Sequence, residues 1–283
     1  MRVLSLVLLA FVFFSCSKDS SSDGHVDLGQ VSEQLVEASG LVESVANPHH
    51  LWTLNDSDRP SEVYLIDEQA QTKMVCKLNG ISNRDWEDIA IGAGADPAKK
   101  YLYVADIGDN NAVYPFKYIY RFEEPSLSNG KEQTISDIEK IVVALPDGKR
   151  DSETIMIDPT TNDFYILSKR EDSVRIYMSS YPFPTDTIRP KEMFKLPFSQ
   201  IVSGSISNDA QQVLLKNYNA IYYWKRSSEK TLIELLAKKP EELTYDSENQ
   251  GETICWNSDG TGFYTLSESP DVGPRAQLRY YKK

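Results

Sequence analysis

Histidine and cysteine are scarce in this chain, with 3 of each among 283 residues. His25 lies in a polar N-terminal segment, and His49 and His50 are adjacent in one predicted loop. A Ser-His-Asp triad needs a histidine and many zinc sites use several, so neither is expected here. Cys76 and Cys255 stand in apolar strand patterns without metal-ligand spacing, which predicts small core residues rather than a disulfide framework.

Positive charge is also in short supply. The 30 Lys and Arg residues stand against 42 Asp and Glu, a formal net charge of −12. Excess negative charge is repelled by the phosphates of nucleic acids and by anionic lipid headgroups. We therefore expect no nucleic-acid partner, and attachment to a membrane would need an anchor other than surface charge.

The N-terminal residues 1–15 have the pattern of a signal peptide. Arg2 precedes an apolar run at 3–14 that is too short to span a bilayer as a folded helix. Cys16 follows a serine, so the segment resembles a bacterial lipoprotein signal in which Cys16 receives the lipid. An ordinary secretory signal is the alternative. The pattern predicts a cell-envelope protein, lipid-anchored to the outer membrane, with exposure at the cell surface left open.

The residues after the signal have two parts. Residues 16–30 are polar and acidic, which predicts a flexible tether. Residues 31–283 have the length of one all-β domain of barrel or propeller size. No segment in them shows the apolar period of a long amphipathic helix.

One phrase recurs along this domain. RDWEDIAI at 84–91 returns as RDSETIMI at 150–157, and GETICW at 251–256 keeps the Glu-x-Ile core. Each copy is followed by a loop and then an aromatic-aliphatic run. Such repetition is typical of radial or stacked architectures, whereas a β-sandwich would not explain it. A linear solenoid would need polar caps at both ends, which the sequence does not show.

Aligned on this phrase, the chain contains five units of short strands rich in Val, Ile, Tyr and Phe. First strands start at 39–41, 87–89, 153–155, 204–206 and 252–254, and second strands follow at 51–54, 101–105, 164–168, 213–216 and 263–267. Third strands are predicted at 63–66, 118–122, 175–179, 220–224 and 276–281. Fourth strands are predicted only in the first four units, at 73–78, 139–145, 192–196 and 231–236.

The fifth unit lacks a fourth strand, and a spare strand pattern lies at 31–38 before the first unit. A ring of four-stranded blades closes if this N-terminal strand completes the last blade, which also removes an exposed sheet edge. The sequence therefore predicts an all-β, five-bladed β-propeller closed by an N-terminal strand. A sixth blade within 123–147 is the alternative, although only one strand pattern lies there.

Polar side chains gather where the first strand of each unit begins and the second strand ends. In a propeller these points lie on one face of the ring, around the central channel. The predicted ligand-binding funnel comprises Asn55, Asp56, Arg84, Asp85, Arg150, Asp151, Lys169, Lys216 and Glu268. The candidate metal ligands are Glu87, Glu153, Glu252, Asp106 and Asp109.

Three of these acids, Glu87, Glu153 and Glu252, occupy equivalent places and are expected to point toward a common axis. Clustered carboxylates cannot all ionise unless a proton, a cation or a basic side chain compensates. Their hard oxygen atoms suit Ca²⁺ or Mg²⁺ rather than zinc. The alternative is structural: the carboxylates accept N–H bonds from a neighbouring blade and pair with Arg84 and Arg150.

Four strings together resemble a largely uncharacterised family of secreted bacterial proteins. They are ASGL at 38–41, NP at 47–48 with LWTLNDS at 51–57, NRDWEDIA at 83–90 and YLYVADIGDN at 101–110. The resemblance implies a β-propeller, in many members a lipoprotein, and no established activity. More distantly the chain is similar to gluconolactonase-type and phytase-like propellers, which use a channel cation. Their metal ligands are not matched residue by residue, so no catalytic role is carried over.

These observations predict an envelope lipoprotein whose acidic funnel binds a ligand together with a divalent cation. One alternative is a metal-dependent hydrolase of the lactonase or phosphoesterase type. Another is a scaffold that binds a second envelope protein through its rim. The sequence leaves open which ligand is bound and whether the protein is an enzyme.

Overall fold

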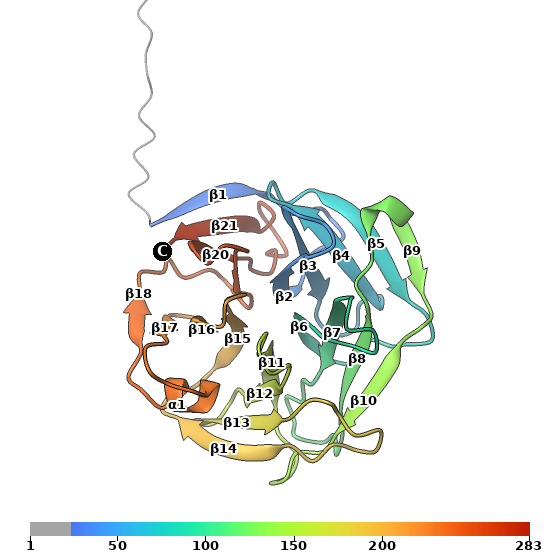
Figure 1. The fold of residues 1–283 in the computed structure, drawn as a ribbon. Helices are drawn as coiled ribbons and strands as arrows, with labels where there is room; N and C mark the ends of the chain where they lie inside the picture. The colour runs from blue at the N-terminus through green and yellow to red at the C-terminus, as the bar shows by residue number, and fades with distance from the viewer. Residues whose placement is uncertain (1–23) are drawn as a thin grey trace, which may run out of the picture.

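A computed structural model describes residues 24–283 of the protein. They form five small β-sheets in a ring around a central axis, so the predicted five-bladed β-propeller is confirmed (Figure 1). The predicted signal peptide at 1–15 and Cys16 lie outside the described residues and stay predictions. Between residues 24 and 283, no helix has both the length and the apolar character needed to cross a membrane.

Each blade runs from an inner strand near the axis to an outer strand at the rim. Blade one contains β2 (Ala38–Glu43), β3 (His50–Asn55), β4 (Glu62–Asp67) and β5 (Thr72–Leu78). Blade two contains β6 (Trp86–Gly92), β7 (Tyr101–Asp106), β8 (Lys117–Glu123) and β10 (Glu139–Val143). Blade three contains β11 (Ser152–Ile157), β12 (Phe164–Ser168), β13 (Val174–Ser179) and β14 (Lys191–Leu196). Blade four contains β15 (Ile201–Ile206), β16 (Gln212–Asn217), β17 (Ile221–Lys225) and β18 (Glu241–Leu243).

Blade five is built from both ends of the described chain. It contains β19 (Cys255–Trp256), β20 (Gly262–Thr265) and β21 (Gln277–Lys282), and β1 (His25–Gln30) pairs antiparallel with β21 as its outer strand. Figure 1 shows β1 beside β21 at the rim. Closure by an N-terminal strand is therefore confirmed.

The position of that closing strand corrects the prediction. The strand lies at 25–30, inside the predicted tether, and the predicted segment 31–38 is mostly loop before β2. Its apolar residues Val31 and Leu35 are buried in the core between blades five and one, so their spacing reflects the packing of a buried turn.

Two other predicted elements differ. Residues 231–236 hold a short helix, α1 (Leu232–Leu236), and the outer strand of blade four is β18. Thr231 and Glu234 form a capping box at the start of α1, a sequence signal for a helix that the strand prediction overlooked. Residues 123–147 form no sixth blade: after η1 (Leu127–Asn129), β9 (Glu132–Ile135) adds to β5 in parallel and β10 completes blade two.

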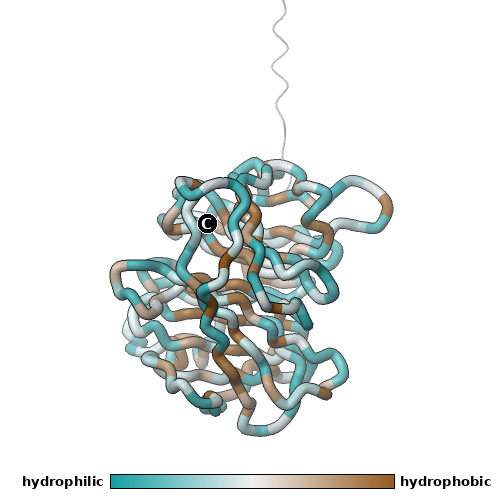
Figure 2. Tube along the Cα trace, turned by 90° about the vertical axis from the view of Figure 1, so that its right-hand side faces the viewer, coloured by the Kyte–Doolittle hydropathy of each residue, from teal (hydrophilic) through white to brown (hydrophobic). Residues whose placement is uncertain are grey.

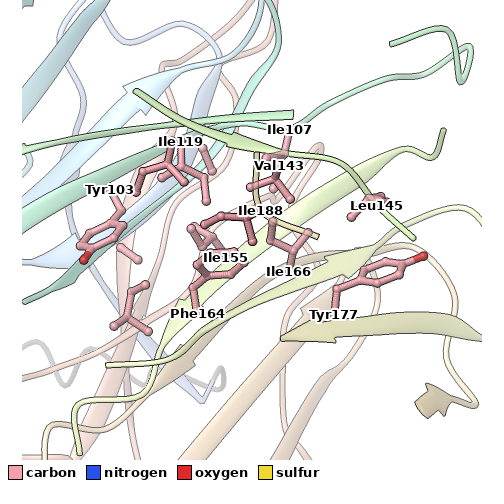
Figure 3. Close-up of a cluster of buried hydrophobic side chains, with 14 residues drawn as sticks. Tyr103, Ile107, Ile119, Val143, Leu145, Ile155, Phe164, Ile166, Tyr177 and Ile188 are labelled. Atoms are coloured by element: carbon pink, nitrogen blue, oxygen red, sulfur yellow. The ribbon is translucent and has the colours of Figure 1, made fainter. Parts of the chain in front are cut away.

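The apolar core lies between adjacent blades. Hydrophobic stretches lie in the strands, and the loops are mainly hydrophilic (Figure 2). Figure 3 shows one such layer, in which Tyr103 and Ile119 of blade two face Phe164 and Ile166 of blade three. Because each blade buries both faces against its neighbours, the inner strands are held at fixed distances from the axis.

Side chains also tie the inner strands together, because strands of neighbouring blades do not pair. The Asp88 carboxylate accepts hydrogen bonds from the backbone N–H groups of Ile89 at 2.9 Å and of Ile155 at 3.0 Å. The Ser203 hydroxyl accepts one from Ile254 N–H at 3.3 Å. Asp88 therefore accepts the inter-blade N–H bond that the structural alternative assigned to the funnel glutamates.

Candidate functional site

An acidic pocket of about 270 Å³ opens at the axis, on the face where the inner strands begin. We call it the funnel pocket. Its lining contains five carboxylic acids and two cationic side chains. The lining residues are Asp56, Glu87, Asn110, Glu153, Lys169, Arg170, Gln200, Tyr218, Gln250, Glu252 and Glu268.

Bulges in two inner strands place two of these acids. In blade two the pairing skips Glu87, because Trp86 pairs with Asp106 and Asp88 with Ala105. In blade three it skips Glu153 in the same way. A residue left unpaired at a bulge is re-aimed relative to its neighbours, and both glutamates line the funnel pocket. The repeated phrase in the sequence thus encodes a repeated bulge.

Lys169 is the central cation of the pocket. Its Nζ lies 2.7 Å from Oε1 of Glu153 and 3.7 Å from Oε1 of Glu252. The Tyr218 hydroxyl donates to the same Glu252 oxygen at 2.5 Å. All three charged groups are buried, so Lys169 compensates two carboxylates from different blades.

Glu87 has no such compensation. It is 3 % exposed, and within residues 24–283 its carboxylate forms neither an ion pair nor a hydrogen bond to another group. Its oxygen lies within 4.8 Å of oxygens of Asp56 and Asp85, and a similar group joins it to Asp151 and Glu153. Glu87 is therefore the shared member of two carboxylate clusters. A third cluster joins Asp56 to Glu252 and Glu268.

Gly108 makes room for these carboxylates. A Cβ at this position would lie 2.1 Å from Oε1 of Glu87 and 2.4 Å from Cγ of Asp85. Only glycine fits where a backbone approaches other groups this closely. The loop after β7 is consequently in van der Waals contact with the acidic cluster.

Burial in this setting raises the pKa of several acids. Burial, followed by repulsion from Glu153, Asp56 and Asp85, raises the pKa of Glu87 well above its usual range. Burial raises the pKa of Glu153 to about 8, although Lys169 opposes the shift. Burial likewise raises the pKa of Asp56 to about 7 and that of Glu268 to about 8. These acids retain protons near neutral pH unless a cation replaces them.

The predicted metal ligands Asp106 and Asp109 are turned to other partners. Asp106 lies 3.0 Å from the Arg84 guanidinium. Asp109 accepts backbone N–H bonds from Val113 at 2.6 Å and from Tyr114 at 2.9 Å, which fixes the loop that follows. Neither lines the funnel pocket.

The cation partners differ from the predicted ones. Arg84 pairs with Asp106, and Arg150 pairs with Asp147 and Glu171 at 2.9 and 2.7 Å. The structural alternative, in which Arg84 and Arg150 pair with the funnel glutamates, is not what the structure shows, because both pair with other acids and neither lines the pocket.

The remaining predicted residues support the pocket from outside its lining. Asp151 pairs with Arg170 at 2.5 Å, and Asp85 lies in a cluster with Glu87. Lys216 is fully buried and donates to the carbonyl of Gly251, the residue before Glu252. Asn55 accepts backbone N–H bonds from Val36 and Glu37 at 3.1 Å and so fixes the chain entering β2.

Five lining residues lie outside the predicted set: Asn110, Arg170, Gln200, Tyr218 and Gln250. Gln200 and Gln250 each stand just before the inner segment of a blade, with positive φ of 59° and 47°. Gln250 stands two residues and Gln200 four residues before the predicted starts, so an alignment extended by four residues toward the N-terminus would have included both. Tyr218 follows the predicted strand end at Lys216.

Comparisons with known proteins found only distant structural matches. No family model and no curated protein matches the chain. Among solved structures, that of U3-55K matches at 11 % identity and a TM-score of 0.42, covering 87 % of this chain and 68 % of its own. A chain of the nidogen/laminin complex matches at 10 % identity and a TM-score of 0.45, covering 81 % and 72 %. Likenesses this distant carry no argument about function.

Proposed function

We propose that this protein is a cell-envelope lipoprotein whose funnel pocket binds a divalent cation and, through it, a small ligand. The observation that carries the proposal is Glu87: a buried carboxylate without a partner in the described chain, lining the pocket and shared by two carboxylate clusters. A buried charge needs compensation, and a cation among these oxygens would supply it.

The donor set favours Ca²⁺ or Mg²⁺. All acids of the clusters offer oxygen, which hard cations prefer, and no histidine or cysteine belongs to them. Ca²⁺ takes about six to eight oxygen ligands. Each cluster offers fewer carboxylates than that, so oxygen atoms of water or of a bound ligand would complete the shell.

The proposal predicts stabilisation by added cation. A cation that binds only the folded state at 100 times its Kd adds about 2.7 kcal/mol to the free energy of unfolding. For a chain of this size that raises Tm by about 5 °C or more. Chelator-treated protein should be melted with and without Ca²⁺, Mg²⁺ and Mn²⁺, and binding measured by calorimetry.

Glu87→Gln provides the decisive variant. The amide is nearly isosteric with the protonated acid and does not titrate, so the cation-free variant should be at least as stable as wild type at neutral pH, while the gain with cation disappears. Glu33→Gln removes the same charge from a side chain that is 92 % exposed and should keep the full gain. A wild-type Tm that ignores both chelator and all three cations would refute the proposal.

A metal-dependent hydrolase is the second candidate. Asp56, with a pKa raised by burial to about 7, belongs to two of the carboxylate clusters. A carboxyl group that titrates near neutral pH beside a bound cation could serve as general acid or base. Turnover of an ester, lactone or phosphoester panel that requires added cation and is lost in Asp56→Asn would favour the enzyme; cation binding without turnover would favour ligand binding alone.

The membrane anchor is tested separately. Cys16→Ala should release the protein from the membrane fraction, because the described residues include no membrane-spanning helix that could hold it there. The measurement is the distribution of wild type and variant between membrane and soluble fractions. Equal membrane association of the two would exclude lipidation of Cys16 as the anchor.

A further inference from the structure

A second and larger pocket lies far from the axis, at the rim between blades three and four. This rim groove has a volume of about 840 Å³. It is lined by the end of β14 and the loop after it, by β17, and by the segment from α1 to β18. Its residues are Phe194, Lys195, Leu196, Pro197, Phe198, Tyr222, Leu236, Ala237, Lys238, Lys239, Pro240 and Glu242.

The floor of the rim groove is apolar and preorganised. The Phe198 ring stacks on Tyr222 with centroids 3.9 Å apart, and it meets Trp224 edge-on at 6.2 Å. Phe194 and Phe198 are both only half-buried, so their rings remain available to a partner. Aromatic floors of this kind provide the buried anchors of many protein interfaces.

The charge of the rim groove is opposite to that of the whole protein. It carries three lysines and a single glutamate, whereas the chain has a formal net charge of −12. Lys195 and Lys239 are exposed and form no ion pair within residues 24–283, and the nearest carboxylate to Lys238, that of Glu229, is 3.9 Å away. Unpaired lysines around an apolar floor are complementary to an acidic partner.

The backbone beside the rim groove also has a free edge. β14 is the outermost strand of blade three, and no strand of the described chain pairs with its outer side. In blade one the corresponding edge is covered: β9 adds to β5 in parallel, with Val75 N–H donating to the Lys131 carbonyl at 2.8 Å. An outer strand of this propeller can therefore accept a fifth strand.

We propose that the rim groove docks an extended acidic peptide segment of another protein. Its backbone would lie along the edge of β14, an aromatic or aliphatic side chain would pack on Phe198, and its Asp or Glu residues would pair with Lys195, Lys238 and Lys239. Addition of a strand to a free edge is an established mode of peptide recognition, in which pockets for alternate side chains give specificity.

The test uses a random twelve-residue peptide library selected on the immobilised protein. Enriched sequences are expected to combine acidic residues with an aromatic or aliphatic residue. The double variant Lys195→Glu with Lys239→Glu should weaken binding of the best peptide at least tenfold by fluorescence anisotropy. Lys131→Glu with Lys149→Glu makes the same charge change at two exposed lysines outside the groove and should alter binding less than twofold.

Phe198→Ala should weaken the binding of the same peptide but leave the salt dependence of that binding. The variant lacks the aromatic anchor and keeps the three lysines. The proposal is overturned if no sequence is enriched, if the enriched peptides lack acidic residues, or if the groove and control variants bind equally. It is also overturned if phosphatidylglycerol vesicles sediment the wild type, but not the groove variant, while peptides fail to bind. That result would assign the lysines to lipid headgroups.

Discussion

The two ends of the central axis are built by the same inner strands and differ in chemistry. Where the strands begin, five carboxylic acids surround the funnel pocket of about 270 Å³. Where they finish, a pocket of about 90 Å³ is lined chiefly by aliphatic side chains such as Ile89, Ile155 and Ile157, with Glu43 as its one carboxylic acid. We call it the distal pocket. Regular alternation of side chains along a strand would not by itself turn these acids toward the pocket. The bulges at Glu87 and Glu153 contribute, because a bulge changes which residues face the axis.

The comparison suggests a division of labour: the apolar end stabilises the fold, so the buried acids at the other end need not contribute to its stability. The buried carboxylates lie on one face of the ring, and apolar packing at the other end fixes the inner strands to which they belong. The variants below break or sharpen this division.

The largest effect is expected from a polar group placed at the distal pocket. Ile155→Asn removes a side chain that is 1 % exposed and buries an amide in its place. We expect a loss of about 4 kcal/mol in the free energy of unfolding, from the cavity and the unpaired amide together. Urea unfolding measures it, and a loss below about 1 kcal/mol would mean that the apolar end contributes little to stability.

A smaller effect is expected at the funnel pocket from Gly108→Ala. The added methyl group would displace the Glu87 and Asp85 carboxylates that lie against Gly108. We expect cation affinity to fall by about 30-fold, which corresponds to about 2 kcal/mol, with a modest decrease in Tm. Gly80→Ala serves as a comparison, since nothing lies within 4 Å of its added Cβ although its φ of +74° carries its own strain. Equal affinities for the Gly108 variant and wild type would place the cation away from Glu87.

A third effect, spread over several pH units, concerns pH. The pKa values of Glu87 and Glu153 are raised by burial in the folded state, the latter to about 8. From the unfolded pKa of about 4.3 up to the folded value, the unfolded chain loses protons that the folded protein keeps. The cation-free protein should therefore lose stability as pH rises from 5 to 8. Each group contributes up to about 1.4 kcal/mol per pH unit.

Glu87→Gln removes one of these groups and should make the fall with pH shallower, because the amide does not titrate. Saturating Ca²⁺ should flatten it in wild type for the same reason, since a bound cation replaces the protons. Urea unfolding at pH 5, 6, 7 and 8 measures both slopes. Identical slopes for wild type and variant would contradict the assigned protonation of Glu87.

Much of the fold could be predicted because the repeat and the strand period are local properties of the sequence. The five inner strands lie near their predicted starts, and the ring closes through an N-terminal strand. The prediction chose the wrong closing segment. Val31 and Leu35 resemble a strand pattern, but they are apolar because a buried loop packs them into the core. It also missed α1, where the Leu232, Leu235 and Leu236 spacing of a helix was taken for a strand.

The site was predictable to the extent that it follows the repeat. Glu87, Glu153 and Glu252 do line one pocket, as equivalent positions in a ring must. The pairing of Lys169 with Glu153 and Glu252 could not be read from spacing. This pairing depends on which side chains from neighbouring blades come into contact, and the strand pattern does not specify that. Val202 stands at the bulge of blade four, so the repeat carries no acid there.

The pairing of β1 with β21 has a consequence for the order of assembly. These strands join residues near the two ends of the chain, such as His25 with Tyr281. Such contacts have a high loop-closure entropy and form late. During synthesis the ring cannot close until residues through Lys282 have emerged, and until then the inner face of blade one lacks its blade-five neighbour. The face of blade one that packs against blade five therefore stays uncovered until the end of synthesis.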